Sequence, residues 1–467
     1  MPHPFLALDP AGAAPLYRQI YTRFRTAIAE GLLAPGERAP AARGLAAELG
    51  LARGTVEAAY SLLTAEGYFT AKGQAGTFVT PRLDAKALAS PRLRARASAD
   101  AHPMGTSVSV RPFQMGLPAL DAFPRKIWAR LAARCARATT ASSMVQHQDA
   151  SPALRRAIAS YLQVSRVIEC VPEQVFITGG YRNTLDLVCR ALLKTGDAMW
   201  TEDPGYPPTR ELLNHAGIET VPVPVDAEGL VVTTGITRAA RARGAVVTPA
   251  HQSPLCVTMS LARRLALLDW AEQARAWIVE DDYDGEYRYV SQPLPALKSL
   301  DRQGRVLYAG SFSKVLFPGL RLGYLVVPEP LIGRFEEITR IFQGGPANLT
   351  QDIVAGFMVE GHFARHIQRM RRLYAERRQA VVAGLTSVFD DRLRIEPQPG
   401  GMHLVVRTLG SDSEFARRIR ADGMYAHAVS EWAVQAVFKP AILISFTNIA
   451  TESAASTLGR RIMAQID

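Results

Sequence analysis

Between residues 198 and 309, short apolar segments alternate with stretches of helical periodicity. The apolar segments are 198–201, 244–248, 276–280 and 305–309, and each ends in polar or charged residues. Short apolar runs of this kind are typical of parallel strands covered by helices on both faces of their sheet. The pattern predicts an α/β fold with a mainly parallel sheet, with the polar residues at the carboxyl ends of the strands.

The first 80 residues follow a different pattern. Apolar residues recur every four positions at Leu16, Ile20, Phe24 and Ile28, which marks one face of a helix. Two more helical segments follow, and each is closed by a glycine. We expect helices over 15–30, 43–49 and 53–66, then strands over 68–70 and 77–80. Three helices followed by a two-stranded hairpin form a winged helix-turn-helix.

The length of the chain and one biased segment predict its domains. At 467 residues the chain exceeds what a single hydrophobic core usually organises. Residues 81–110 are dominated by Ala, Arg, Ser and Pro and show no periodicity, which is typical of a linker. We therefore expect a winged helix-turn-helix over 1–80, a linker over 81–110 and an α/β domain over 111–467.

Charge, hydropathy and cysteine usage limit the class of protein. The formal net charge is +11, and residues 1–110 hold 12 Lys and Arg against 8 Asp and Glu. Basic charge favours nucleic-acid binding and solubility about equally, so it does not identify a partner. No apolar run reaches the roughly 18 residues of a membrane span. The four cysteines are scattered, as expected in a reducing cytoplasm and not in a disulfide framework or zinc site. We expect a cytoplasmic protein without a membrane span or a metal.

The segment SFSKVLFPGLRLGY, residues 311–324, follows the last apolar strand. Its lysine, Lys314, lies after two hydroxyl residues, Ser311 and Ser313, and seven residues before Arg321. A lysine at the end of a buried strand is placed to form a Schiff base with an aldehyde cofactor. Hydroxyl groups and an arginine beside it suit a dianionic phosphate. These are the requirements of pyridoxal 5′-phosphate (PLP).

Other strand and loop ends carry groups that suit the same cofactor. Asp281 follows the strand 276–280 and could accept a hydrogen bond from the pyridinium N–H, and Tyr283 could bond the ring's phenolate oxygen. Upstream, backbone N–H groups at a helix start and one aromatic ring could bind the phosphate and stack on the cofactor. The residues concerned are Gly180, Tyr181 and Arg182 for the phosphate and Tyr206 for the ring. Each feature alone is more often ordinary surface, turn or packing, but together they favour one PLP site.

These motifs carry a resemblance to a known family. Residues 113–467 resemble the fold-type I aminotransferases, and the whole chain is similar to the MocR subfamily of GntR regulators. The resemblance lies in EDPGYPPTR (202–210), VTPAHQSPLCVTMSLARRLALLDWA (247–271), WIVEDDYDGEYRY (277–289) and the lysine segment. It implies Lys314 as the Schiff-base lysine and Asp281 as the partner of the ring nitrogen. It also implies a dimer, because each site in such proteins borrows residues from the other subunit.

Departures from the family pattern occur at four places. The phosphate loop reads 179–182 as Gly-Gly-Tyr-Arg, and Pro-Leu-Cys at 254–256 stands where Pro-Thr-Gly is common. Either Gln252 or Ser253 could be the additional partner of the ring oxygen. His147 replaces a tyrosine that reaches the partner subunit's phosphate. Residues 442–445, Ile-Leu-Ile-Ser, stand where aminotransferases place an arginine for the substrate carboxylate; Arg407 or His403 could substitute for it, or be ordinary surface residues.

The N-terminal stretches PLYRQIYTRFRTAIAEGLLAPGERAP and LAAELGLARGTVEAAYSLLTAEGYFTAKGQAGTFV resemble the GntR winged helix. In that geometry the N-terminal end of the third helix faces the major groove of DNA. The resemblance implies DNA contacts from Arg43, Arg53, Thr55, Lys72 and Gln74, the last two at the tip of the wing. The alternative is a helical protein-interaction module with scattered basic residues.

The hypothesis we favour is a PLP-dependent transcriptional regulator that binds operator DNA as a homodimer. It would sense PLP, or an amine or amino acid, through an aldimine at Lys314. The alternative is a catalytically active aminotransferase with an auxiliary N-terminal module. A third possibility is a protein that binds PLP to buffer the cofactor or to scaffold partners.

Overall fold

A computed structural model describes residues 6, 8–9, 14–81, 110–145, 150–289, 295–342, 345–396 and 400–466. The chain separates into two compact units, Met1–Ser107 and Val108–Asp467, which are described one at a time. The predicted linker, apart from its two end residues, and His147 lie outside the described residues. The domain boundaries given above stay predictions.

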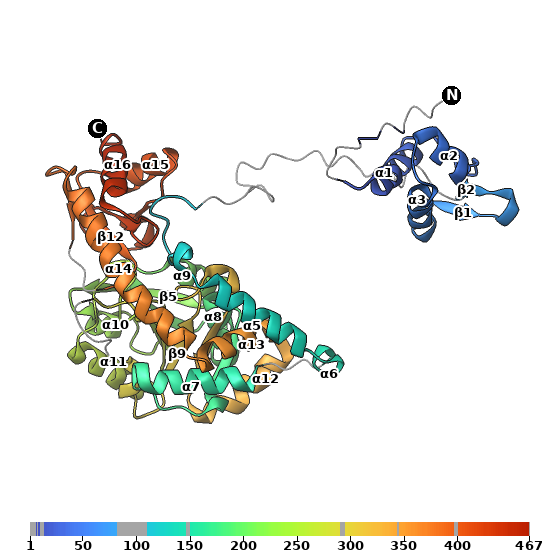
Figure 1. Cartoon of the computed structure of the whole chain (residues 1–467). Helices are drawn as coiled ribbons and strands as arrows, with labels where there is room; N and C mark the ends of the chain where they lie inside the picture. Colours follow the sequence, from blue (N-terminus) through green and yellow to red (C-terminus); the bar gives the residue numbers. More distant parts are fainter. Residues whose placement is uncertain are drawn as a thin grey trace. The chain divides into compact units, whose positions relative to one another are not determined.

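The N-terminal unit is a winged helix-turn-helix, drawn in blue in Figure 1. It consists of α1 (Leu16–Ala29), α2 (Ala42–Leu49), α3 (Arg53–Ala65) and the antiparallel pair β1 (Phe69–Ala71) and β2 (Thr77–Val79). Each predicted helix and strand is confirmed to within one residue at either end. Gly50 ends α2 with φ 65°, the left-handed conformation that a glycine adopts without a steric penalty.

The periodic apolar residues of α1 form the centre of this unit's core. Ile20, Phe24 and Ile28 are buried there together with Leu45 of α2 and Val56 of α3. Three aromatic rings, those of Phe24, Tyr60 and Phe69, meet edge to face with centroids 5.1–5.5 Å apart. The rings join α1 and α3 to the wing.

The larger unit is built on an eight-stranded sheet in the order β3-β10-β9-β8-β7-β4-β5-β6. Strands β5, β4, β7, β8 and β9 are mutually parallel, and β10 is antiparallel to both β9 and β3. The predicted apolar segments form β4 (Ala198–Asp203), β7 (Gly244–Val247), β8 (Trp277–Asp282) and β9 (Val306–Ser311). The sheet is completed by β3 (Val175–Thr178), β5 (Glu219–Asp226), β6 (Gly229–Leu230) and β10 (Gly323–Val326). The prediction of a mainly parallel α/β sheet is confirmed.

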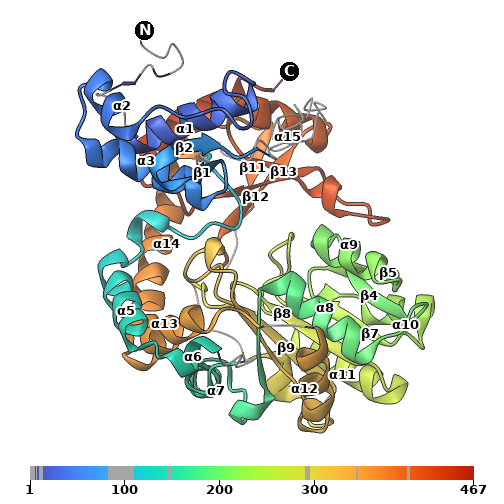
Figure 2. The same cartoon turned by 90° about the vertical axis from the view of Figure 1, so that its right-hand side faces the viewer.

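Helices cover both faces of this sheet (Figures 1 and 2). Side chains alternate along each strand, so Ile177 packs against one helical layer and Phe176 against the other. One face is covered by α5 (Arg125–Ala138), α7 (Pro152–Arg166), α13 (Asn348–Val359), α10 (Val232–Ala239) and α11 (Leu261–Ala274). The other carries α8 (Tyr181–Leu192), α9 (Pro207–His215) and α12 (Ile332–Phe342). The short α6 (Ala141–Val145) follows α5.

The long helix α14 (His362–Thr386) joins the large sheet to a C-terminal subdomain. Phe363 and Ile367 in its first turns pack with the large sheet, whereas Met370 and Tyr374 belong to the C-terminal core. That subdomain is a four-stranded antiparallel sheet with two helices. Its elements are β11 (Leu393–Ile395), β12 (His403–Thr408), β13 (His427–Ala428), β14 (Ala441–Ser445), α15 (Asp412–Ala421) and α16 (Glu452–Met463).

A buried ion cluster fixes the carboxyl end of β8. Arg166, at the end of α7, is 2% exposed and lies 2.5 Å by its Nε from Oδ2 of Asp282. The same carboxylate accepts a hydrogen bond of 2.6 Å from the hydroxyl of Tyr308 on β9. The Nη2 atom of Arg166 lies 3.4 Å from Oε1 of Glu286. One guanidinium is therefore the counter-charge for two buried carboxyl groups on either side of the turn after β8.

We expect Arg166→Met to lower the free energy of unfolding of the large unit by about 3–5 kcal/mol, because it leaves two buried carboxylates without a counter-charge. Urea denaturation followed by tryptophan fluorescence measures this, since all five tryptophans lie after residue 110. The matched control is Arg190→Met, which removes a surface pair with Asp186 and should cost less than about 1 kcal/mol. Equal losses for the two variants would contradict the role given to the cluster.

Candidate functional site

A cavity of about 350 Å³ opens where the carboxyl ends of β8 and β9 meet the N-terminus of α8. All ten residues predicted to bind the cofactor line it. They are Gly180, Tyr181, Arg182, Tyr206, Asp281, Tyr283, Ser311, Ser313, Lys314 and Arg321. Residues that are up to 141 positions apart in the sequence are thus brought into one pocket by the topology of the sheet.

Lys314 lies three residues after β9, and its amine faces this cavity. Its Nζ donates a 3.2 Å hydrogen bond to the carbonyl of Gly116. A Cβ on Gly116 would lie 2.4 Å from that Nζ, so a glycine is needed for the amine to reach this position. Burial lowers the pKa of the Lys314 ammonium, and the carboxylates of Asp284 and Asp281 oppose this shift. A lowered pKa increases the share of neutral amine, the form that attacks an aldehyde.

The carboxyl end of β8 divides its side chains between the interior and the cavity. Asp282 points toward Arg166, whereas its neighbours Asp281 and Tyr283 line the cavity. Burial raises the pKa of the Asp281 carboxyl well above its usual range, the charges of Asp282 and Glu202 add to the shift, and Lys314 opposes it. A buried carboxylate of this kind stabilises a cation placed beside it, such as a protonated ring nitrogen.

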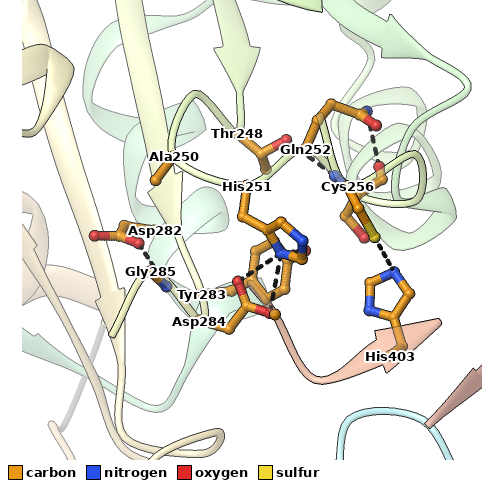
Figure 3. A network of polar contacts seen from close by, with 12 residues as sticks. Thr248, Ala250, His251, Gln252, Cys256, Asp282, Tyr283, Asp284, Gly285 and His403 are labelled. Carbon is orange, nitrogen blue, oxygen red and sulfur yellow. Dashed lines mark hydrogen bonds and ion pairs between the residues drawn. The ribbon is translucent and has the colours of Figure 1, made fainter. Parts of the chain in front are cut away.

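Tyr283 is part of a polar network that is shown in Figure 3. Its hydroxyl lies 3.1 Å from Nδ1 of His251, and the same nitrogen lies 3.0 Å from Oδ1 of Asp284. The structure also distinguishes Gln252 from Ser253, the two residues predicted as alternative partners of the ring oxygen. Ser253 lines the cavity, whereas the Gln252 amide donates to Glu202 Oε2 at 3.1 Å and to the Pro204 carbonyl at 2.9 Å.

The opposite end of the cavity suits a phosphate. Gly180 precedes the first turn of α8 with φ 96°, and the first N–H groups of a helix have no partner within the helix. Arg182 in this turn and Arg321 after β9 line the same end, together with Ser311 and Ser313. Unpaired helix N–H groups, hydroxyls and two guanidinium groups fit the charge of a phosphate dianion.

A row of neighbouring aromatic rings forms one wall of the cavity. The Tyr206 ring centroid lies 6.0 Å from that of Tyr181 and 5.7 Å from that of Trp432. Trp432 in turn lies 5.9 Å from His427. Tyr206 is therefore available as a stacking surface, and the wall extends beyond it into the C-terminal subdomain.

Sequence reasoning missed several residues of this site. Asp284, Met402, Tyr425, His427 and Trp432 also line the cavity. Asp284 could have been found, because it follows the same strand end as Asp281 and Tyr283. The others come from the C-terminal subdomain, whose approach to the large sheet no local pattern in the sequence indicates.

The residues predicted to contact DNA lie on the N-terminal unit. Arg43 is exposed on α2, Arg53 is exposed at the first position of α3, and Thr55 is half-buried two residues further. The Nε of Arg53 lies 2.7 Å from Oε1 of Glu57 in the same helix. That pair is exposed, so it holds the arginine weakly and leaves it free to exchange toward a phosphate.

The wing carries the other two predicted residues. Lys72 is exposed with its Nζ 5.0 Å from the ring centroid of Phe78, and Gln74 is exposed in the turn between β1 and β2. Sequence reasoning missed Arg38, which is exposed and pairs its backbone with Phe78 of the wing. A Cβ on Gly76 would lie 3.1 Å from the Nε of Arg38. The wing therefore presents two cations close to its turn.

The described part of the chain shows neither a membrane-spanning helix nor a metal-binding cluster. None of the helices described here is both long and apolar enough to cross a membrane. The described residues also include no group of three or more His, Cys, Asp and Glu that could hold a metal ion.

Comparison with known proteins identifies the two units. Residues 118–452 match aminotransferase class I and II, and residues 16–79 match bacterial regulatory proteins of the gntR family. The chain is 40% identical over 413 residues to the probable rhizopine catabolism regulatory protein MocR of Rhizobium meliloti, covering 86% of this chain and 83% of that protein. It is 34% identical over 410 residues to the pyridoxine biosynthesis transcriptional regulator PdxR of Corynebacterium glutamicum, covering 86% and 85%.

Solved structures agree on the fold of the larger unit. The multiple substrate aminotransferase from Thermococcus profundus superposes with a TM-score of 0.68 at 26% identity, covering 77% of this chain and 92% of that one. The matches to MocR and PdxR each cover 86% of this chain, which is more than the larger unit alone, whereas this structural match covers 77%. The chain belongs to the MocR subfamily of GntR transcriptional regulators, in which a winged helix-turn-helix precedes a fold-type I aminotransferase-like domain.

Proposed function

We propose that this regulator binds PLP through Lys314 and that the cofactor, or an amine that reacts with it, changes the affinity of the winged helix for operator DNA. One observation carries the proposal. Ten residues chosen from the sequence for PLP chemistry line a single cavity, in a chain that also holds a DNA-binding unit. A ligand changes DNA affinity only if it binds two states of the protein unequally, so the cofactor unit must have two states.

The chemistry of the lining supports PLP as the ligand. Lys314 supplies the amine for covalent attachment, and Asp281 supplies a carboxylate for the ring nitrogen. Tyr283 and Ser253 supply hydroxyls for the ring oxygen, and Tyr206 offers its ring for stacking. Bound in this way, PLP supplies an aldehyde that reacts with amines and a ring that withdraws electrons from the product.

The DNA part of the proposal depends on the exposed cations of the winged helix. Arg53 begins α3, the helix whose N-terminal end faces the major groove in this motif, and Arg43 lies on α2. Lys72 lies on the wing, where it would meet phosphates or the minor groove. A homodimer would present two such units to the two half-sites of an operator.

The alternative is a working aminotransferase. The presence of Lys314, Asp281 and Tyr283 in the cavity favours it, as does the match to aminotransferase class I and II. The lack of an arginine at 442–445, where all four side chains are buried in β14, argues against efficient turnover of amino acids. Steady-state transamination with a panel of amino donors and an α-keto acid separates the two: sustained turnover supports the enzyme, and a single half-reaction or none supports the regulator.

Lys314→Ala should abolish covalent cofactor binding while leaving the fold intact, because Lys314 supplies the only proposed attachment atom. Absorbance of the protein–PLP mixture after dialysis, with and without borohydride, measures this. Lys439→Ala, which removes an exposed lysine, is the control and should keep the reducible absorbance. Borohydride-trapped cofactor in the Lys314→Ala variant would refute the assignment of the lysine.

Arg43→Gln and Arg53→Gln should each weaken binding to the operator by about 1–3 kcal/mol if they contact base edges. Lys72→Gln should weaken binding to all sequences alike and reduce the slope of log K against log salt by about 1. Fluorescence anisotropy with DNA from upstream of the protein's own gene and with a scrambled duplex measures both effects. Unchanged affinity in all three variants would contradict the proposed DNA surface.

A further inference from the structure

Cys256 lies in the wall behind the cavity in an unfavourable backbone conformation. Its φ is 61°, in the left-handed region that favours glycine and is costly for a residue with a Cβ. The side chain is 1% exposed, and its Sγ lies 3.0 Å from Nε2 of His403 (Figure 3). Cys256 and His403 come from a loop of the large sheet and from β12 of the C-terminal subdomain, 147 residues apart.

His403 connects this thiol to the cavity. It is buried, it begins β12 opposite Ser445, and it lines the cavity itself. Its Nε2 lies 3.0 Å from the Cys256 sulfur and 3.3 Å from the Pro254 carbonyl oxygen. Within the described part of the chain, Nδ1 of His403 has no hydrogen-bond partner. The imidazole therefore has one nitrogen to offer to a ligand.

The surrounding charges favour the protonated form of this imidazole. Burial opposes charge on both groups, but the imidazoles of His403 and His251 outweigh it and lower the pKa of Cys256 to about 6. Burial also lowers the pKa of His403, but the Cys256 thiolate raises it by more, so the net shift is upward. Smaller contributions come from His251, which lowers this pKa, and from Asp284, which raises it. The lowered pKa of the thiol and the raised pKa of the imidazole both favour the thiolate–imidazolium form of the pair, in which Nδ1–H is a charged donor.

Other cations are excluded from this position by their contacts. Arg407 on the same strand pairs with Glu396 at 2.7 Å and does not line the cavity. His427 lines the cavity, but its Nε2 lies 2.9 Å from the Tyr425 hydroxyl and its Nδ1 lies 3.5 Å from Glu431. Arg182 and Arg321 belong to the proposed phosphate end. Among the described residues that line the cavity, His403 is thus the side chain left to offer positive charge to a second group on a ligand that reacts at Lys314.

We propose that His403, whose Nε2 is held by Cys256, binds an anionic group of the effector through its Nδ1, so that the effector is an amino acid and not a simple amine. The inference rests on the proposed function, because it requires the effector's amino group to react with PLP at Lys314. The dyad would replace the arginine that is missing at 442–445. Cys256 is a positioning residue here: it acts on the effector only through the charge of His403.

The test compares each amino acid with the amine that it becomes when its carboxylate is removed. The pairs are L-alanine and β-alanine with ethylamine, and L-phenylalanine with 2-phenylethylamine. Each is titrated into the PLP-loaded full chain at several pH values between 6 and 8.5, and the apparent Kd is read from the cofactor absorbance. The carboxylate also changes the pKa of the amine and therefore the share of neutral amine, so each ratio of Kd values is compared with the same ratio in a variant, for which this difference is the same. We expect at least one amino acid to bind about tenfold or more tightly than its amine.

Two variants remove the two halves of the dyad. His403→Gln should lower the ratio by about fivefold or more at every pH, leaving the part that comes from the different pKa values of the two amines. Cys256→Gly suits the backbone at φ 61°, so it should fold at least as well as the wild type; without the thiolate, buried His403 should lose its proton as pH rises. In Cys256→Gly the preference should therefore be weaker than in the wild type and fall further as pH rises from 6 to 8, whereas the wild type keeps it across this range. Arg407→Gln is the control and should leave the ratio unchanged.

A second readout needs no cofactor. In the apoprotein, propionate should shift the NMR signal of the His403 ring, and ethylamine should not. If amines and amino acids change the cofactor absorbance equally in the wild type, or if His403→Gln keeps the preference, the inference is wrong while the proposed function stands. If no amine or amino acid changes the absorbance, both the inference and the amine-sensing form of the proposed function are wrong.

Discussion

The ion cluster around Arg166 determines how β8 delivers its side chains to the cavity. The guanidinium binds Asp282 and lies beside Glu286, five residues from Asp281 at the other end of the turn. Because side chains alternate along a strand, fixing Asp282 toward the interior directs Asp281 and Tyr283 to the opposite side. Loss of this cluster would therefore displace Asp281 and Tyr283, the two side chains proposed to bind the cofactor ring, although the cluster itself does not contact the ring.

The remaining parts of the site converge for reasons of topology. The carboxyl ends of parallel strands meet at one edge of a sheet, so the residues after β8 and β9 lie together, and the N-terminus of α8 faces the same edge. The C-terminal subdomain adds His403 from β12, Tyr425 from the loop before β13 and Trp432 from the 3-10 turn after β13. Asp203 contributes to this junction, because its carboxylate accepts the N–H groups of residues 434, 435 and 436 at 2.7–2.8 Å. A ligand that contacts both sheets is suited to favour one of two arrangements of the subdomain, as coupling to DNA binding requires.

The sequence predicted the parts of the fold that depend on local pattern. The strands β4, β7, β8 and β9 are apolar runs, and the helices of the N-terminal unit keep a spacing of four. It missed β5, in which Pro222 and Pro224 would argue against a strand. These prolines are tolerated because β5 pairs along its length with β4 only, and its other side meets just the two-residue β6.

The candidate site was predictable where the residue type and its position at a strand end are enough to indicate a role, as for Lys314 and Asp281. It was not predictable where two distant segments decide the outcome. Gln252 and Ser253 are neighbours in sequence, yet only the fold shows that Gln252 turns to Glu202 and Ser253 to the cavity. Cys256 was visible as a departure from a Pro-Thr-Gly turn, but its partner His403 lies in the other sheet.

The central claim is that chemistry at Lys314 is coupled to DNA binding. Its most direct test is the fluorescence anisotropy of one labelled operator duplex titrated with apoprotein, with PLP-loaded protein and with PLP-loaded protein plus amino acid, at fixed salt. We expect operator affinity to differ between these states by about fivefold or more, and Lys314→Ala to abolish the difference. The same affinity in all three states, for a duplex that is bound more tightly than a scrambled one, would contradict it.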